Sequence, residues 1–203
     1  MKNIIIVGVS RAGKTTLAQA VARAIGATGM AVSFISADAL FGGVTEIKKH
    51  SLFYVAFARP LKHLIPALGR LHKRDLRRDL HTCAHRFINE QAQVSVVVYE
   101  DAYMTLAQAK HMFGDDKFQI VAIGYPESDI DKKIADIRKY DGDTPANRKS
   151  YSELYLMISS LVKASKKLRG DAQKYGIPFI DTSVRYRETI QEFADGVVDL
   201  LSE

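Results

Sequence analysis

The sequence has little that would cross-link the chain or hold it in a membrane. Its only cysteine, Cys83, excludes an internal disulfide, which is the usual condition of a protein kept in a reducing compartment. No stretch approaches ~18 uninterrupted apolar residues, and the apolar run from Ile4 to Val7 is too short for a signal-peptide core or a membrane span. We therefore expect a soluble, cytoplasmic protein.

The chain also lacks internal repeats, low-complexity tracts and linkers rich in Gly, Ser or Pro. Its 203 residues fit one domain with room for a small lid, and a chain of this length buries a sizeable core without disulfides or metals. We predict a single domain over residues 1–203.

Strands are expected to alternate with helices along the chain. Several predicted strands are near-continuous apolar runs, which is typical of a parallel sheet covered on both faces, so the pattern predicts a three-layer α/β fold. The predicted strands span residues 3–8, 31–36, 94–98, 118–123 and 178–180. Helices are predicted over 14–27, over 103–112, around 130–137, 154–168 and 190–200, and in a stretch before residue 91 that is broken near Pro60, Pro66 and Gly69.

Residues 8–15, GVSRAGKT, match the phosphate-binding pattern G-x-x-x-x-G-K-[ST] between a strand and an amphipathic helix. The two glycines let backbone N–H groups turn toward phosphate oxygens, and the N-terminus of the following helix points at the same anion. Lys14 is expected to reach the β- and γ-phosphates, and the Thr15 hydroxyl to ligate magnesium, so the sequence predicts ATP (or a related nucleoside triphosphate) with Mg²⁺. The expected nucleotide-binding residues are Gly8, Ser10, Arg11, Ala12, Gly13, Lys14, Thr15 and Thr16.

The phosphate loop, together with the order of elements over nearly the whole chain, resembles the P-loop kinases of the group containing adenylate kinase, uridine kinase, shikimate kinase and chloramphenicol phosphotransferase. The resemblance implies a P-loop NTPase fold with a five-stranded parallel sheet in the order 2-3-1-4-5. It also implies an acceptor site after the second strand and a mobile basic lid late in the chain. We expect an acceptor-side helical insertion over about 44–91 and a lid over about 138–150.

A small-molecule kinase is the favoured function, with a hydroxyl- or phosphate-bearing acceptor such as a nucleoside or nucleotide. A GTPase is excluded, because no glycine has Asp three residues before it and the N-K-x-D pattern is absent. Two alternatives stay open: a P-loop NTPase or ATP-binding module that acts with a macromolecular partner, and a kinase that acts on nucleic-acid ends.

Asp38 follows the second predicted strand, on the side of an open α/β sheet where ligands bind. A carboxylate there can accept the proton of an acceptor hydroxyl during phosphoryl transfer. The alternative is that Asp38 caps the next helix.

Two acids, Glu100 and Asp101, follow the third predicted strand in a loose Walker-B-like arrangement. A carboxylate at this place can hold Mg²⁺ through water, so we expect one of the pair to serve the metal. Asp101 has the alternative role of an N-cap for residues 103–112.

Two arginines flank the core of the polar loop over residues 141–150: Arg138 precedes it and Arg148 lies near its end. In the resembling kinases a lid brings arginines onto the transferring phosphate, where they offset developing charge. The alternative is a surface loop with ordinary charges. After the fifth strand, residues 181–183 occupy the place where such kinases hold the base, unless they simply cap the last helix.

The net charge of +6 is concentrated in one segment, because Arg59–Arg86 holds eight Lys or Arg against two Asp and the rest of the chain is balanced. A helix over about 75–90 would separate an apolar side from a basic side. That basic side is either a solvated surface or a flap over an anionic acceptor, whereas nucleic acid is less expected because no aromatic residues are interleaved for base stacking. The apolar side holds Leu76, Leu80, Cys83 and Phe87, and the basic side Arg74, Arg77, Arg78, His81 and His85.

Overall fold

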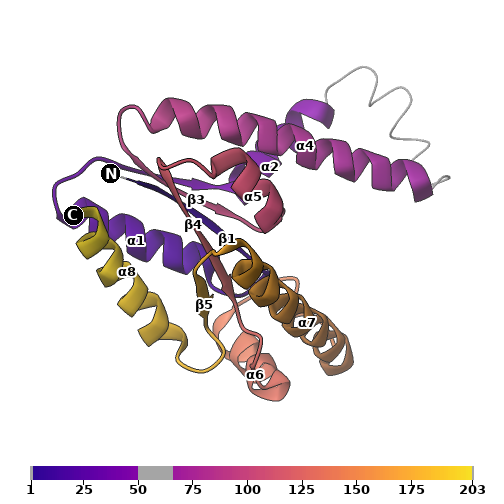
Figure 1. Cartoon of the computed structure of the whole chain (residues 1–203). Helices are drawn as coiled ribbons and strands as arrows, with labels where there is room; N and C mark the ends of the chain where they lie inside the picture. The colour runs from indigo at the N-terminus through magenta and orange to yellow at the C-terminus, as the bar shows by residue number, and fades with distance from the viewer. Residues whose placement is uncertain (1, 50–65, 203) are drawn as a thin grey trace.

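Five parallel strands form one sheet in the order β2-β3-β1-β4-β5, as predicted (Figure 1). The computed structural model describes residues 2–49 and 66–202. The central strand is the apolar N-terminal run, which pairs with β3 on one side and β4 on the other. The strands are β1 (Asn3–Gly8), β2 (Val32–Ser36), β3 (Val96–Asp101), β4 (Phe118–Gly124) and β5 (Phe179–Asp181).

Helices cover both faces of this sheet. Ile4 and Ile6 of β1 face one apolar cluster with α1 and α8, while Ile5 and Val7 face a second cluster with α4 and α5. Figure 1 shows α1 and α8 side by side on their face. Within residues 2–49 and 66–202, no helix combines the length and the apolar character needed to cross a bilayer. The helices are α1 (Lys14–Ala27), α2 (Ala37–Lys49), α4 (Pro66–Gln91), α5 (Leu106–Phe113), α6 (Ile130–Tyr140), α7 (Tyr151–Tyr175) and α8 (Tyr186–Ser202).

The third strand starts later and runs further than predicted. It includes Tyr99, Glu100 and Asp101, all buried, where the sequence suggested that the strand ends at residue 98. The apolar run VSVVV ends at Val98, so the sequence pattern places Tyr99, Glu100 and Asp101 after the strand. Both carboxylates are satisfied here: Glu100 accepts from Ser36 and Thr15 of other elements, and Asp101 accepts from Tyr99 of the same strand and from backbone N–H groups of the following turn.

The helix after β3 starts at a cap that the sequence analysis did not identify. Thr105 is its N-cap, and its hydroxyl accepts from the Gln108 N–H while the Gln108 side chain accepts from the Thr105 N–H. This reciprocal capping box satisfies two backbone donors of the first turn. Asp101 is therefore not the cap of α5, contrary to the alternative considered for it.

The basic helix is α4, and its buried side differs from the prediction. Leu80 and His81 are buried, whereas Cys83 and Phe87 are exposed, because the helix packs through Leu80, Ala84 and Ile88. The predicted break at Pro60 lies outside the described residues, and so do the side chains of residues 66–76, including Arg74. Pro66 is the first residue of α4, a position that suits proline, and Gly69 lies inside the helix without ending it.

Candidate functional site

The phosphate loop joins β1 to α1 in a shape that depends on its two glycines. A Cβ on Gly8 would lie 2.4 Å from the carbonyl oxygen of Ile123, so only glycine lets β1 and β4 approach here. Gly13 adopts the left-handed conformation with φ of 95°, and a Cβ on it would lie 2.7 Å from the Tyr186 ring. Arg11 is also left-handed, with φ of 65°, although it is not a glycine. The loop thus turns its backbone inward, as an anion cradle requires.

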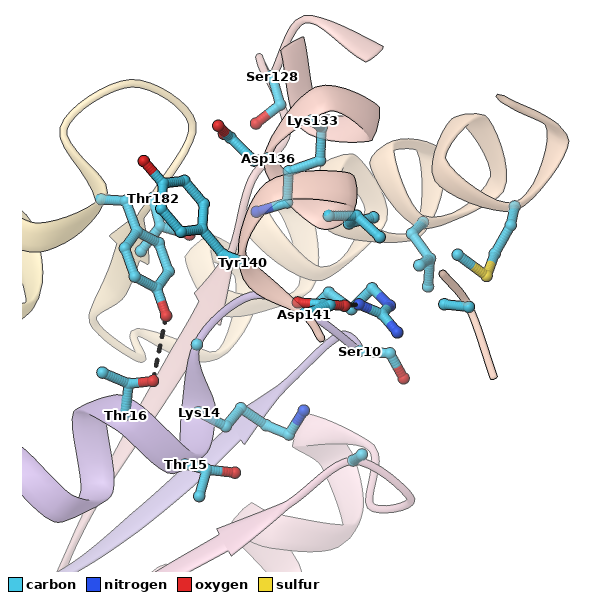
Figure 2. A pocket seen from close by; sticks show the side chains of 18 of the residues that line it. Ser10, Lys14, Thr15, Thr16, Ser128, Lys133, Asp136, Tyr140, Asp141 and Thr182 are labelled. Atoms are coloured by element: carbon cyan, nitrogen blue, oxygen red, sulfur yellow. Dashed lines mark hydrogen bonds and ion pairs between the residues drawn. The ribbon is translucent and has the colours of Figure 1, made fainter. Parts of the chain in front are cut away.

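A cavity of about 1230 Å³ lies over this loop, lined by residues that follow each of the five strands (Figure 2). Such a place, outside the carboxyl ends of parallel strands, is where open α/β sheets bind ligands. Of the expected nucleotide-binding residues, the lining includes Ser10, Arg11, Gly13, Lys14, Thr15 and Thr16. Gly8 and Ala12 belong to the loop but not to this lining, and Ala12 is fully buried.

Lys14 is a nearly buried cation at the floor of the cavity, 8% exposed. Its Nζ donates a hydrogen bond of 3.0 Å to the carbonyl oxygen of Val9, which folds the side chain back along the loop. Burial lowers the pKa of Lys14, and the nearby carboxylates of Glu100 and Asp38 oppose this shift. A desolvated ammonium with incomplete pairing gains from an incoming anion, which is what a phosphate group supplies.

Glu100 faces the phosphate loop from the end of β3. Its Oε1 accepts hydrogen bonds from the Ser36 hydroxyl at 2.6 Å and from the Thr15 hydroxyl at 3.3 Å. The side chain is 2% exposed but lines the cavity, so its carboxylate and the Thr15 hydroxyl form a pair of hard oxygen donors beside Lys14. Ser36, at the end of β2, holds this carboxylate and was not among the residues predicted for the site.

Asp101 points away from the cavity into a closed network. Its Oδ2 accepts from the Tyr99 hydroxyl at 2.6 Å and lies 3.6 Å from Nε2 of His81, while its Oδ1 accepts from the backbone N–H of Tyr103 at 2.5 Å and of Met104 at 2.9 Å. The residue is fully buried. Asp101 therefore fixes the turn after β3, and of the two acids Glu100 alone lines the cavity among the residues described.

Asp38 lies on the acceptor side of the cavity, in the first turn of α2. Since α2 begins at Ala37, Asp38 is inside the helix and does not precede it as a cap would. Its Oδ1 accepts a hydrogen bond of 2.7 Å from the Tyr103 hydroxyl. Burial and this hydrogen bond raise the pKa of Tyr103 to about 12, so the phenol remains a donor to Asp38 at neutral pH.

The two arginines expected in the lid have partners within the 141–150 loop. Arg138 donates to the backbone carbonyl oxygens of Asn147 and Lys149, and Arg148 forms a two-point pair with Asp143 at 2.7 and 2.6 Å. Both are surface contacts, and neither arginine belongs to the described lining of the cavity. In this conformation they hold the loop in shape and do not face the phosphate loop.

Other cations line the cavity, among them Arg11 and Lys133. Arg11 of the phosphate loop forms an ion pair with Asp141, the residue that ends α6. Lys133 of α6 has its Nζ 4.5 Å from the centre of the Tyr125 ring and 5.6 Å from that of Tyr186, and burial lowers its pKa. Figure 2 shows Lys133 and Asp141 on the side of the cavity opposite Lys14.

Lys133 was missed in the sequence, although a signal for it exists. Its spacing places it on the same helix side as Ile130, Ile134 and Ile137, and a lysine on the buried stripe of an amphipathic helix is unusual. Such a residue either pairs with a buried partner or reaches into a cavity. Here its ammonium contacts two aromatic faces at the cavity wall.

Residues after β5 connect the phosphate loop to the last helix. The Thr182 hydroxyl hydrogen bonds to the carbonyl oxygens of Ala12 and Gly124, each at 3.1 Å, and the Tyr186 hydroxyl donates to Oγ1 of Thr16 at 3.1 Å. Thr182 is 2% exposed, and its two hydrogen bonds fix the phosphate loop to the end of β4. Val184, in contrast, lines the cavity with a largely exposed side chain, 76%.

The site fits a magnesium nucleotide. Within the described residues no group of three or more His, Cys, Asp or Glu side chains could hold a metal ion by itself. His81 and His85, four residues apart on α4, therefore have no third ligand of these types near them. Magnesium usually binds proteins through one or two side chains and takes its other oxygen ligands from phosphates and water. Thr15 and Glu100 supply such a donor set beside the glycine-lined loop.

Known structures resemble this fold, whereas no protein-family model and no curated protein sequence matches the chain. A shikimate kinase from Acinetobacter baumannii, solved in complex with shikimate, is 14% identical with a TM-score of 0.54, over 99% of this chain and 93% of that one. A gluconokinase from Sinorhizobium meliloti 1021 is 18% identical with a TM-score of 0.53, over 98% of this chain and 93% of that one. Both are P-loop kinases, so the expected fold is confirmed.

Proposed function

We propose that this chain is an ATP-dependent kinase that transfers the γ-phosphoryl group to a small acceptor bearing a hydroxyl or phosphate group. The main observation behind this proposal is that one cavity brings together Lys14, the Thr15–Glu100 oxygen pair and Asp38. The first two groups suit a magnesium triphosphate, and the third suits an acceptor hydroxyl.

Each residue has a separate task in the proposed reaction. Lys14 and the loop N–H groups bind the phosphates, and Thr15 and Glu100 hold Mg²⁺, which when bound neutralises developing charge on the phosphate oxygens. Asp38 orients the acceptor hydroxyl and takes its proton. The hydroxyl oxygen then forms a bond to the γ-phosphorus as the bond from that phosphorus to the β–γ bridging oxygen breaks, and ADP leaves.

The 138–150 segment is proposed to act as a lid over this reaction. Its loop begins at Asp141, which already pairs with Arg11 of the phosphate loop. Arg138 and Arg148 would have to exchange their present partners for phosphate oxygens if they offset charge in the transition state. Lys133 already lines the cavity, and Arg11 lines it too but would exchange Asp141 for phosphate oxygens.

The acceptor class draws support from two directions. The sequence favoured a nucleoside or nucleotide, while the two similar structures are a shikimate kinase and a gluconokinase. All four kinds of compound present a hydroxyl that a carboxylate can orient. These compounds differ in size and charge, so an activity screen can distinguish which of them is the acceptor.

The test is an ADP-release screen with MgATP across nucleosides, nucleotides, shikimate, gluconate and other hydroxylated metabolites. A kinase shows slow ATP loss alone and rapid loss with one acceptor, together with a phosphorylated product of that acceptor. Turnover that responds only to a macromolecule, or none above that of the Lys14→Ala variant with any acceptor, would reject the proposal. Phosphorylation of polynucleotide ends would identify the end-kinase alternative.

A further inference from the structure

The turn that follows β3 connects a buried histidine to the carboxylate of Asp38. His81 of α4 lies beside Asp101, whose carboxylate accepts from the backbone N–H of Tyr103. The Tyr103 hydroxyl in turn donates to Asp38. We propose that His81 is a positioning residue, which acts through Asp101 and Tyr103 to hold Asp38 in the orientation that the acceptor hydroxyl needs. The inference rests on the proposed function for that last step alone.

His81 is a buried polar residue that does not belong to the described lining of the cavity. Within the described part of the chain, its Nε2 has no hydrogen-bond partner and no access to solvent. Nε2 lies 3.6 Å from Oδ2 of Asp101, just beyond the range of about 2.7–3.2 Å for an N–H···O bond. A buried nitrogen without a partner costs free energy, so a movement of less than about 1 Å that closes this contact is favoured.

The imidazole of His81 is neutral near pH 7. Burial lowers the pKa of His81, the carboxylate of Asp101 opposes this shift, and the positive charge of Arg77 adds to it. A neutral imidazole carries one proton, and a carboxylate opposite Nε2 favours the tautomer with that proton on Nε2. His81 therefore presents an N–H donor to Asp101 without adding a charge to the buried site.

The two oxygens of the Asp101 carboxylate hold different parts of the fold. Oδ1 accepts from the backbone N–H groups of Tyr103 at 2.5 Å and Met104 at 2.9 Å. Oδ2 accepts from the Tyr99 hydroxyl at 2.6 Å and lies beside His81. Tyr99 is on the same strand, so among the described contacts of this carboxylate His81 supplies the one from another element. Because the carboxylate is planar, a rotation that moves Oδ2 also moves Oδ1 and the backbone that it holds.

Tyr103 transmits this position to Asp38 through a packed side chain. Its ring stacks on Phe41, with centres 5.0 Å apart and planes 25° apart, and its hydroxyl donates to Oδ1 of Asp38 at 2.7 Å. A tyrosine side chain has only two main rotatable bonds, so a shift of its backbone is passed on to its hydroxyl. Without that donor, the Asp38 carboxylate is no longer held toward an acceptor hydroxyl.

A purely structural role for His81 predicts a different result, because the residue is also part of the buried side of α4. His85 is the matched control, since it is an imidazole four residues further along the same helix. Its ring packs against that of Phe113, with centres 5.5 Å apart, and in the described structure it forms no ion pair with Asp101. His81→Leu and His85→Leu both replace a ring by an apolar side chain of similar size, and only the first removes a donor from Asp101.

The first experiment needs no phosphoryl transfer. The Cζ NMR signal of Tyr103, assigned from Tyr103→Phe, is recorded near neutral pH, and Asp38→Asn supplies the reference for a hydroxyl without a charged acceptor. We expect His81→Leu to move the signal most of the way to that reference. His85→Leu should leave it in place, and so should His81→Gln, whose amide N–H can replace that of Nε2. His81→Met, which also lacks the N–H and adapts to irregular space, replaces His81→Leu if the latter does not fold.

A Tyr103 signal that stays in place in His81→Leu, or that moves equally in His85→Leu, would overturn the inference. Either result leaves the proposed kinase function standing, because ADP release is measured separately. Movement specific to His81→Leu in a protein that phosphorylates no acceptor would keep the coupling of His81 to Asp38 and reject the kinase.

The second experiment measures steady-state kinetics with the acceptor identified in the screen. His81→Leu should lower kcat about fivefold to tenfold and leave the KM of ATP within about twofold, because the phosphate loop is untouched. In the Tyr103→Phe background the same substitution should not lower kcat further, because the connection to Asp38 is already broken. Additive losses in the double variant, or an equal rise in the KM of ATP, would assign His81 a structural role and contradict the inference.

Discussion

The hydroxyl of Thr15 lies 3.3 Å from Oε1 of Glu100, although the two residues are 85 positions apart in the chain. One belongs to the first turn of α1 and the other to the end of β3, and the parallel pairing of β1 with β3 brings them together. The contact places a carboxylate beside the loop residue expected to bind magnesium. It also separates the roles of Glu100 and Asp101, because only Glu100 faces this hydroxyl.

Replacing Glu100 by Gln should weaken the use of magnesium. The variant keeps the size and the contact to Ser36 but removes the charge that faces Thr15, so a higher Mg²⁺ concentration is needed for half-maximal activity. We expect a rise of about tenfold, the scale of one lost charge-assisted contact. The measurement is ATP turnover against free Mg²⁺ at fixed ATP.

Asp101→Ala is the matched comparison for Glu100→Gln. It removes the acceptor of the Tyr99 hydroxyl and of two backbone N–H groups, so it should lower the free energy of unfolding by about 3 kcal/mol. In the fraction that remains folded, the Mg²⁺ dependence should be nearly unchanged. If Asp101→Ala shifts the Mg²⁺ dependence and Glu100→Gln does not, the assignment is reversed.

Lys14→Ala should weaken nucleotide binding strongly and leave the fold intact. The ammonium contacts only the Val9 carbonyl within the described structure, so the fold loses one hydrogen bond, whereas a triphosphate loses its principal side-chain cation. MgATP affinity should fall about tenfold or more. Calorimetric titration measures the affinity, and circular dichroism with thermal unfolding checks the fold. Normal affinity in a folded variant would contradict the assignment.

Asp38→Asn should slow transfer without weakening ATP binding. The amide keeps the size and hydrogen-bonding reach but cannot take the acceptor proton, so kcat should fall about 10²-fold or more, the usual scale for a general base. ATP affinity should change less than about threefold, because phosphate binding is a separate task. Steady-state kinetics with the acceptor identified in the screen measures both, and full activity in the variant would refute the role.

The same variant has a spectroscopic consequence at Tyr103. The hydrogen bond to Asp38 and the charge of its carboxylate both favour the protonated phenol, so removing them should lower the pKa of Tyr103 from about 12 toward the ordinary value near 10. Burial, the larger cause of the shift, remains. The tyrosine Cζ NMR signal reports the titration, and an unchanged pKa would show that the contact is not formed in solution.

Tyr103→Phe tests whether this hydrogen bond orients Asp38. The loss of the donor should lower kcat by about tenfold, with ATP affinity unchanged. Tyr151→Phe is the matched control, because the Tyr151 hydroxyl likewise donates to a carboxylate, that of Asp131, away from the cavity. Equal effects of the two substitutions would assign the Tyr103 contact a structural role only.

Asp141→Asn should strengthen ATP binding. Asp141 occupies the Arg11 guanidinium, and without that charge Arg11 is released to the phosphates. A partly exposed ion pair contributes up to about 1 kcal/mol, which corresponds to at most about a fivefold lower dissociation constant. Asp143→Asn, which breaks the surface pair with Arg148, should leave the constant unchanged. Weaker binding in Asp141→Asn would show that the pair instead preorganises the loop.

The sequence by itself determined the features that depend on neighbouring residues. The phosphate loop, the apolar strands and the amphipathic helices are local patterns, and with the resemblance they were enough for the parallel sheet and its strand order. Asp38 was placed at the cavity on the same basis, because it follows a strand whose end lies at the ligand edge.

Only the tertiary structure decided which charged groups face the cavity. Glu100 and Asp101 are adjacent, so strand alternation sends them to opposite sides, and the partners Thr15 and Tyr99 show which side is which. The sequence predicted Arg138 at the transferring phosphate and did not single out Lys133, yet Arg138 bonds to its own loop while Lys133 reaches two aromatic rings from other elements. A side chain's partner across the fold is a long-range contact, and local pattern carries no information about it.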